Sequence, residues 1–217
     1  MSIEPKKILA AVKEAKEKAE KRNFTQSVEL ILTLQDIDMK SPGGRLQENV
    51  ELPYPPPEKT NKICVIATGE LALKAKRANA DLVMDRAQLE GLAGKKKELR
   101  KIANDYDFFI VEAPLMPLVG KILGAVLGPR GKMPIPAPPT ADIESLLNKY
   151  RRTVVIRMRN QPVIQCLIGT ENMKEEEIVE NIQAVLRTIE GKMKRGIKNV
   201  KLVCIKTTMG APVKIKP

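Results

Sequence analysis

Apolar and polar positions follow two different patterns along the chain, and the pattern changes twice. In residues 3–22, apolar side chains recur every three or four positions between lysines and glutamates, which predicts an amphipathic helix. Ser2 is a candidate N-cap, Pro5 is tolerated in the first turn, and Asn23 is expected to end the helix. Residues 26–34 alternate instead, which predicts a strand with one buried face. The residues of that face are Val28, Leu30, Leu32 and Leu34.

A proline-rich segment separates this first part from the middle of the chain. A loop at 41–45 leads to a second expected strand at 46–52. The segment Pro53-Tyr-Pro-Pro-Pro57 follows, and proline at this density favours a stiff, extended connector. We interpret it as a hinge between two domains.

The middle of the chain has longer apolar runs. Residues 62–67 are almost continuously apolar, which is typical of a strand buried on both faces. Short strands at 82–84 and 108–112 alternate with helices, and a loop is expected at 127–139. The expected helices span 70–78, 86–92, 95–104, 115–126 and 141–149. This alternation predicts a parallel sheet joined by right-handed crossovers.

The alternating pattern returns in the last third. Strands at 153–159 and 163–168 are expected to form a hairpin, followed by a helix at 174–190 that Gly191 ends and a strand at 199–206. The outer thirds therefore predict one split α+β domain with an antiparallel sheet, and the middle predicts an inserted α/β domain. The expected domains are residues 1–56 with 152–217, and residues 58–150. Two chain crossings between compact bodies favour hinge motion.

Composition narrows the class of partner. Lys and Arg outnumber Asp and Glu by 38 to 26, giving a net charge of +12. Such a charge attracts polyanions, most commonly nucleic acid, with an acidic membrane surface as the runner-up. The N-terminal stretch does not read as a signal peptide, and no apolar run is long enough to span a bilayer.

Metal and cofactor chemistry are not predicted. Histidine is absent, which removes the commonest general base and metal ligand. The cysteines Cys64, Cys166 and Cys204 lie far apart in apolar runs, unlike zinc ligands, and we expect three buried, reduced thiols of a cytosolic protein. After the 62–67 strand, Thr68-Gly-Glu70 lacks the glycines of a dinucleotide fingerprint.

A second glycine-containing segment is harder to dismiss. Gly131-Lys132 does not complete a phosphate loop, because Val126 stands where that motif has its first glycine. Yet residues 113–141 contain no acidic residue and several cations. The loop could bind phosphate, pack between the domains or be a rigid surface loop. Its candidate contact residues are Gly128, Arg130, Gly131 and Lys132.

Basic residues concentrate in the last third. After Glu190 no acidic residue occurs, whereas eight lysines and arginines do. They are Lys192, Lys194, Arg195, Lys198, Lys201, Lys206, Lys214 and Lys216. With Arg157 and Arg159 on the 153–159 strand, and Lys21-Arg22 before Phe24, they are expected to share one face that neutralises RNA phosphates.

The last strand ends in Thr207-Thr208-Met209-Gly210. Hydroxyls can bond ribose 2′-OH groups, methionine can lie against a base, and glycine permits close backbone approach, a set that suits irregular RNA. From composition alone, an ordinary turn at the end of a strand is the competing interpretation.

Three segments together resemble a known family. They are Asn23-Phe-Thr-Gln-Ser-Val-Glu-Leu30, then Leu127-Gly-Pro-Arg-Gly-Lys-Met-Pro-Ile-Pro136 with Pro114-Leu-Met-Pro117 ahead of it, and Lys206-Thr-Thr-Met-Gly-Ala-Pro-Val-Lys-Ile215. They resemble motifs of the large-subunit ribosomal stalk protein family, the "L-one" family, in its archaeal form. The motifs occur in the family's order and span the chain.

The resemblance implies a split α+β sandwich with an inserted Rossmann-like α/β/α domain. It implies a structural protein of the cytoplasmic ribosome, monomeric when free, without cofactor or membrane. It also implies binding to large-subunit rRNA at the mobile stalk near the tRNA in the exit site, and repression of translation by binding its own mRNA.

The resemblance also places the RNA contacts. The matching residues are Phe24, Ser27, Glu29, Thr208, Met209 and Gly210, with Lys206 and Thr207 in the same segment and Arg157 and Arg159 added for their charge. Asn23 departs from the lysine of bacterial members. Glu29 is expected either to accept hydrogen bonds from RNA or to orient Lys206 or an arginine. Two other functions remain as alternatives to RNA binding. They are an enzyme that uses the inserted domain on a nucleotide, and a peripheral membrane protein.

Overall fold

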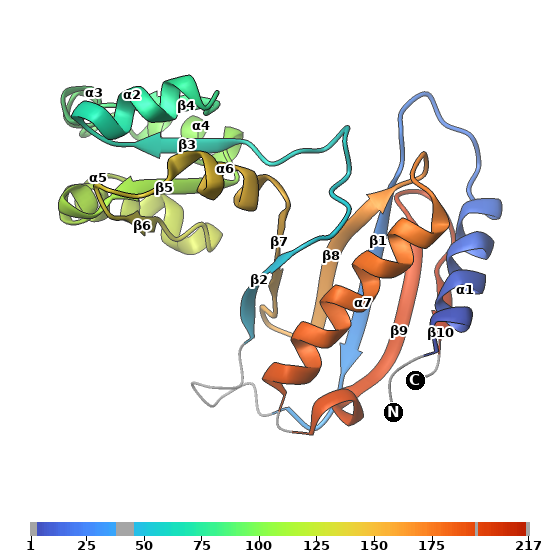
Figure 1. Ribbon diagram of the computed structural model, residues 1–217. Helices are drawn as coiled ribbons and strands as arrows, with labels where there is room; N and C mark the ends of the chain where they lie inside the picture. The colour runs from blue at the N-terminus through green and yellow to red at the C-terminus, as the bar shows by residue number, and fades with distance from the viewer. Residues whose placement is uncertain (1–3, 38–45, 194, 216–217) are drawn as a thin grey trace. The chain divides into compact units, whose positions relative to one another are not determined.

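The computed structural model describes residues 4–37, 46–193 and 195–215 (Figure 1). The predictions for Ser2, the loop 41–45, Lys194 and Lys216 lie outside these ranges. The chain divides into two compact units, residues 1–59 with 152–217 and residues 60–151. Compared with the expected domains, the first crossing falls after Lys59 rather than near residue 57.

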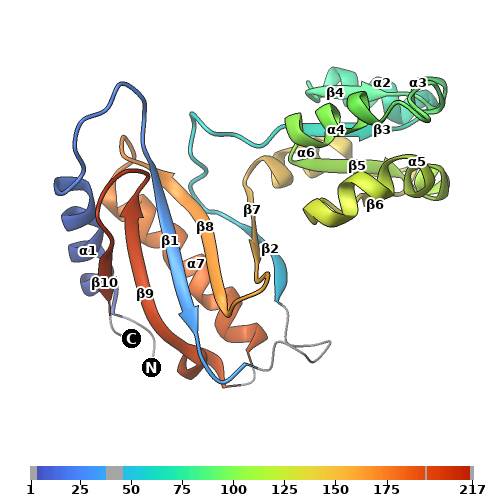
Figure 2. The ribbon, with the colours of Figure 1, turned by 180° about the vertical axis from the view of Figure 1, so that it is seen from behind.

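Unit 1 is a four-stranded antiparallel sheet with two helices on one face (Figure 1). The strand order is β10-β9-β1-β8, with bounds β1 (Ser27–Leu34), β8 (Val163–Thr170), β9 (Val200–Thr207) and β10 (Val213–Ile215). Helices α1 (Pro5–Glu17) and α7 (Glu175–Lys192) cover one face, and Figure 2 shows the other face without a helix. The predicted α+β class with an antiparallel sheet is confirmed.

The strand register explains the core of unit 1. Leu30 pairs with Cys166 on β8 and with Ile205 on β9, and Leu32 stands in the next core row. Both leucines are fully buried, as the alternation predicted. Burying one such side chain contributes about 1.5–3 kcal/mol. Helices α1 and α7 complete this core with buried apolar side chains. These are Ile8, Val12, Ile178, Ile182, Val185 and Ile189.

Several element predictions for unit 1 were wrong at their ends. Helix α1 ends at Glu17, because the chain then turns toward β1 and the buried Gln26 side chain binds the Glu20 carbonyl at 2.9 Å. Helix α7 continues through Gly191 to Lys192, since the left-handed conformation falls at Gly196 instead. The short strand β10 was missed.

The predicted hairpin was also wrong. Strand β7 (Thr153–Arg157) does not pair with β8 but with β2 (Gln47–Glu51), forming a separate two-stranded antiparallel sheet. The five register pairs from Gln47–Arg157 to Glu51–Thr153 join β7 to a strand far away in sequence instead of to its neighbour β8.

Unit 2 is a parallel sheet with the order β4-β3-β5-β6. Its strands are β3 (Ile63–Ile66), β4 (Leu82–Met84), β5 (Phe108–Glu112) and β6 (Ile135–Ala137). Its helices are α2 (Gly69–Arg77), α3 (Arg86–Gly91), α4 (Lys96–Asp105), α5 (Met116–Arg130) and α6 (Ile143–Arg151). Separate apolar clusters cover the two faces of the sheet, so the continuous apolar strands are buried on both sides, as predicted. Two short 3-10 helices, η1 (Ala113–Leu115) and η2 (Gly196–Asn199), complete the elements.

Part of the predicted 127–139 loop is helical. Helix α5 continues to Arg130, so Gly128 and Arg130 belong to its last turn, with Pro129 inside. Gly131 has φ 73° and ends the helix. The Gly131 N–H binds the Gly128 carbonyl at 2.9 Å, and the Lys132 N–H binds the Leu127 carbonyl at 3.2 Å, the bonding pattern of a Schellman motif.

Candidate nucleic-acid interface

The Thr207–Gly210 turn is held by its own side chains. The Gly210 N–H donates to Thr207 Oγ1 at 3.1 Å. A Cβ at position 210 would lie 2.2 Å from that oxygen, so the turn requires glycine there. Thr207 is fully buried. A side chain without exposed surface cannot touch RNA, and we assign Thr207 to shaping the turn instead of contacting RNA as expected.

This turn is joined to the start of β1. The Ser27 N–H donates to Thr208 Oγ1 at 3.0 Å, and the Thr208 N–H donates to the Ser27 carbonyl at 3.0 Å. The Met209 N–H donates to Gln26 Oε1 at 3.1 Å. Two sequence segments about 180 residues apart therefore form one rigid structure. Gln26 was not among the predicted site residues. The sequence feature that could have indicated it is a polar residue directly before an apolar strand.

The joined segments expose two large apolar side chains. Phe24 is 50% exposed and Met209 is 61% exposed. Exposed rings and thioethers are costly in water but suit contacts with unstacked bases. We call this part of unit 1 the Phe24–Met209 surface, formed by Phe24, Ser27, Glu29, Lys206, Thr208, Met209 and Gly210.

Glu29 of β1 and Lys206 of β9 lie opposite one another on neighbouring strands. They are paired in the β1–β9 register, and both are half-buried. Their side chains alternate with the buried Val28, Leu30 and Ile205, which places them on the sheet face that Figure 2 shows without a helix. The strand register thus places Glu29 beside Lys206.

The connector between the units supplies residues that sequence analysis did not predict. Lys59 Nζ donates to Ser27 Oγ. The neighbouring Glu58 accepts a hydrogen bond from Asn172 Nδ2 at 2.9 Å. Side-chain hydrogen bonds from Thr25 and Asn172 lower the pKa of the Glu58 carboxyl below its ordinary value. The connector therefore brings a cation to the Phe24–Met209 surface.

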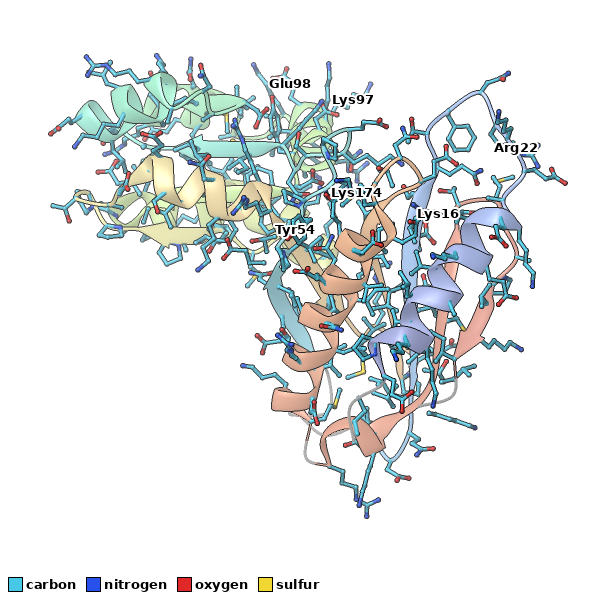
Figure 3. The ribbon with its side chains drawn as sticks, turned by 45° about the vertical axis from the view of Figure 1, so that its right-hand side comes forward. Lys16, Arg22, Tyr54, Lys97, Glu98 and Lys174 are labelled. Atoms are coloured by element: carbon cyan, nitrogen blue, oxygen red, sulfur yellow. The ribbon has the colours of Figure 1, made fainter. Side chains whose placement is uncertain are left out.

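The proline segment, interpreted from the sequence as a hinge between two domains, is anchored to unit 1. The fully buried Asn181 of α7 accepts from the Tyr54 N–H at 3.0 Å. Its Nδ2 donates to the carbonyls of Tyr54 at 2.6 Å and Ile168 at 2.8 Å. These bonds satisfy a buried amide and fix the backbone before Glu58. Figure 3 labels Tyr54 in this segment and Arg22 ahead of β1.

The basic residues of unit 1, which were expected to share one face, are spread along the length of its sheet. Strands β1 and β9 are antiparallel, so Ser27 and Thr207 lie at one end and Leu34 and Val200 at the other. At a rise of about 3.3 Å per residue, the two ends are roughly 23 Å apart. Several cations lie at the second end: Arg157, Arg159, Lys192, Arg195 and Lys198.

Two of the cations at this second end have acidic partners. Arg195 pairs with Asp36 at 2.8 Å, and Lys192 pairs with Glu48 at 3.0 Å. Arg157 and Arg159 therefore stand away from Met209, and we do not include them in the Phe24–Met209 surface.

The cations near Gly131 bind within unit 2. Lys132 Nζ donates to the carbonyls of Ala103 at 3.0 Å and Tyr106 at 2.6 Å, and lies 3.6 Å from Asp107 Oδ1. A cation at the C-terminal carbonyls of α4 complements the helix dipole. Lys132 thus joins α5 to α4 instead of pointing from a loop. Arg130 Nε donates to Asn104 Oδ1 at 3.0 Å.

The three cysteines are free and buried, as predicted. Burial raises the pKa of the Cys64 thiol to about 12, and burial, with a smaller effect of the Glu29 charge, raises that of Cys166 to about 12. Thiols with such pKa values are poor nucleophiles at neutral pH. Within the described ranges, no cluster of acidic, histidine or cysteine side chains could hold a metal ion.

Comparison with known proteins decides the family. The model of the Ribosomal protein L1p/L10e family matches residues 13–211. The chain belongs to this family. It is 50% identical to the large ribosomal subunit protein uL1 of Hyperthermus butylicus over 217 residues, covering 100% of this chain and 99% of the relative.

Two further archaeal relatives agree. The large ribosomal subunit protein uL1 of Methanothermobacter thermautotrophicus is 50% identical over 208 residues, 96% of this chain and 98% of the relative. That of Pyrococcus abyssi is 49% identical over 217 residues, 100% of this chain and 98% of the relative. The resemblance found in the sequence motifs is confirmed.

Family membership also decides between the classes of function. A ribosomal protein family consists of structural proteins rather than enzymes, so the enzyme hypothesis is set aside. Of the helices in the described ranges, none is both long and apolar enough to cross a membrane.

Proposed function

We propose that this chain is a structural protein of the large ribosomal subunit that binds large-subunit rRNA through the Phe24–Met209 surface of unit 1. One observation carries the proposal. The family motifs at residues 23–30 and 206–215 meet through reciprocal hydrogen bonds between Ser27 and Thr208. Together they expose Phe24 and Met209 to a ligand.

The chemistry of this surface suits irregular RNA. Apolar Phe24 and Met209 offer contacts to bases, the Thr208 region offers hydroxyl and backbone groups, and Lys206 with Lys59 offers charge to phosphates. Because buried side chains fix the turn before any ligand binds, little ordering cost opposes binding. The net charge of +12 speeds association with RNA in general.

The finer parts of the proposal concern place and regulation. The relatives are named as large ribosomal subunit proteins, and we place this chain at the mobile stalk, beside the tRNA in the exit site, in the cytoplasmic ribosome. The free protein is a monomer that represses translation by binding its own mRNA. A single preformed surface would serve both RNAs, so the two should compete.

The division of labour between the units gives the test. We replace residues 60–151 by a flexible linker and measure binding to large-subunit rRNA. Unit 1 contains the whole Phe24–Met209 surface, so the shortened chain should keep specific binding and lose it with Met209→Asp. Circular dichroism checks folding. A folded, shortened chain without specific binding would contradict the proposal.

A competition experiment tests the repressor role. In the full chain, rRNA should displace the protein's own mRNA leader. Simultaneous binding of both RNAs would contradict the repressor role.

A further inference from the structure

Helix α4 of unit 2 presents a row of cations. Lys96, Lys97, Arg100 and Lys101 are all exposed. At about 100° per residue, they fall within an arc of roughly 140° on the helix surface. The buried Leu99 and Ala103 fall outside this arc and pack into the unit 2 core. The basic side of α4 therefore faces away from the core.

Arg130 extends this row from a second helix. Its Nε donates to Asn104 Oδ1 at 3.0 Å, and its Nη1 donates to the Val126 carbonyl at 3.0 Å. Asn104 lies about midway around the basic arc of α4. The hydrogen bonds fix the guanidinium of α5 against that arc, with further N–H groups left to donate. We call the five cations Lys96, Lys97, Arg100, Lys101 and Arg130 the α4 basic stripe.

Neighbouring carboxylates do not neutralise the stripe. Glu98 pairs with Lys95 at 3.7 Å, outside the stripe, and Figure 3 labels it beside Lys97. Asp105 lies at the border of the arc. Among the described residues, no ion pair forms with the four α4 cations of the stripe, whereas Lys16 of α1, Lys74 of α2 and Arg86 of α3 each pair with an acid. An unneutralised row of charge on one helix is a polyanion-binding feature.

We propose that the α4 basic stripe binds the phosphate backbone of a second RNA segment, without reading its bases. The inference rests on the proposed function, because the RNA is the one that unit 1 holds. From Lys96 to Lys101 the helix rises about 7.5 Å, roughly two steps of about 3.4 Å along a nucleic-acid strand. An anionic membrane fits less well, since the exposed side of α4 has no bulky apolar anchor.

Two charge-matched variants of the full chain test the stripe. The stripe variant has Lys96→Gln, Lys97→Gln, Arg100→Gln and Lys101→Gln. The control variant changes four other exposed cations of unit 2: Lys62→Gln, Lys76→Gln, Arg77→Gln and Lys121→Gln. Each lowers the net charge of +12 by four. Glutamine is a good helix former, so α4 is expected to persist, and circular dichroism checks it.

The readout is the salt dependence of binding to large-subunit rRNA. The two steps along the strand span about three phosphates, and each lost contact lowers the slope of log K against log salt by about 0.7–0.9, so the stripe variant should lose about two to three in slope. At ~0.1 M salt its affinity should fall at least tenfold relative to the control variant. If the wild type binds specifically and the two variants have equal slopes, the proposed role of the α4 basic stripe is contradicted. The proposed function of unit 1 is then unaffected. Absence of any specific wild-type binding removes both.

A proximity measurement gives an independent answer. All three native cysteines are buried, so a cysteine introduced by Lys97→Cys can be labelled selectively with an iron chelate that generates hydroxyl radicals. In the rRNA complex, the probe at position 97 should cut an RNA strand. A probe placed by Lys121→Cys, also on an exposed lysine of unit 2, should not. Equal cleavage from both positions, or none from position 97, overturns the inference.

Discussion

The Gly210 N–H donates to Thr207 Oγ1 at 3.1 Å, and the same oxygen would lie 2.2 Å from a Cβ at position 210. The buried hydroxyl and the missing side chain thus depend on one another. Their arrangement delivers Met209 to the surface, where it is 61% exposed. The conformation that exposes Met209 is therefore held in place by a buried hydroxyl and a glycine.

A methyl group at position 210 should disturb this turn. Gly210→Ala forces the added Cβ against Thr207, and overpacking of this kind costs about 1–3 kcal/mol. We expect a lower melting temperature and weaker rRNA binding. Gly120→Ala in α5 is the control, because a Cβ there meets nothing within 4 Å and alanine favours the helix. If both variants melt alike, the turn does not depend on Gly210.

The hydroxyl of Thr207 can be tested separately from its size. Thr207→Val keeps the shape but removes the Oγ1 acceptor, so that the Gly210 N–H keeps only the Thr207 carbonyl at 3.2 Å, and the lost hydrogen bond should cost about 0.5–1.5 kcal/mol. Thr207→Ser retains the hydroxyl and should lose less stability and less RNA affinity. Urea denaturation and filter binding measure the two effects. A valine variant that binds rRNA like the wild type would show that the hydrogen bond does not position Met209.

Lys59 should contribute charge to RNA binding. Its ammonium group donates to Ser27 Oγ, beside the joined segments. Lys59→Met should weaken rRNA binding and lower the salt slope by about 0.7–0.9, as expected for one lost phosphate contact. Lys62→Met, an exposed lysine three residues further on, is the matched control. An unchanged slope for Lys59→Met would limit Lys59 to anchoring the connector.

Acid should loosen the contact between α1 and α7. Lys16 Nζ lies 3.2 Å from Glu175 Oε1, and its hydrogen bond is the main cause that lowers the pKa of Glu175 below 4.5. A depressed carboxyl pKa adds stability above the unfolded value of 4.5 and loses it as the pH falls through the folded pKa. Because Glu175 is about one third exposed, solvent screens the pair and the effect stays below about 1 kcal/mol. Glu175→Gln should therefore flatten the melting curve against pH below 4.5; an unchanged curve would contradict this.

Local patterns of apolar and polar residues predicted the helices and strands well, but they did not predict which strands pair. The alternation of Val28 to Leu34 reflects a strand with one covered face, and the apolar runs of β3 and β5 reflect strands with two. Pairing depends on contacts between distant segments, so the β2–β7 sheet could not be read from the sequence around Arg157. For the same reason the sequence did not show that the cations of the last third are spread over both ends of the antiparallel sheet.

The motif residues of the candidate site could be predicted from the sequence, but the residues that hold them in place could not. Phe24, Thr208 and Met209 stood out through family resemblance and composition. Gln26 and Lys59 did not, since their importance lies in single hydrogen bonds to residues far away in sequence. The burial of Thr207 could not be read from the sequence, because its neighbours Lys206 and Thr208 are only half-buried.

The most direct test of the account is a salt titration of rRNA binding by Met209→Asp beside Met133→Asp. Both methionines are exposed, at 61% and 67%, and both changes add one negative charge. Met133 belongs to unit 2, whereas the Phe24–Met209 surface belongs to unit 1. The account predicts that Met209→Asp loses specific binding with a nearly unchanged salt slope, while Met133→Asp binds like the wild type. Equal affinities for the two variants would contradict the assignment of the Phe24–Met209 surface to RNA.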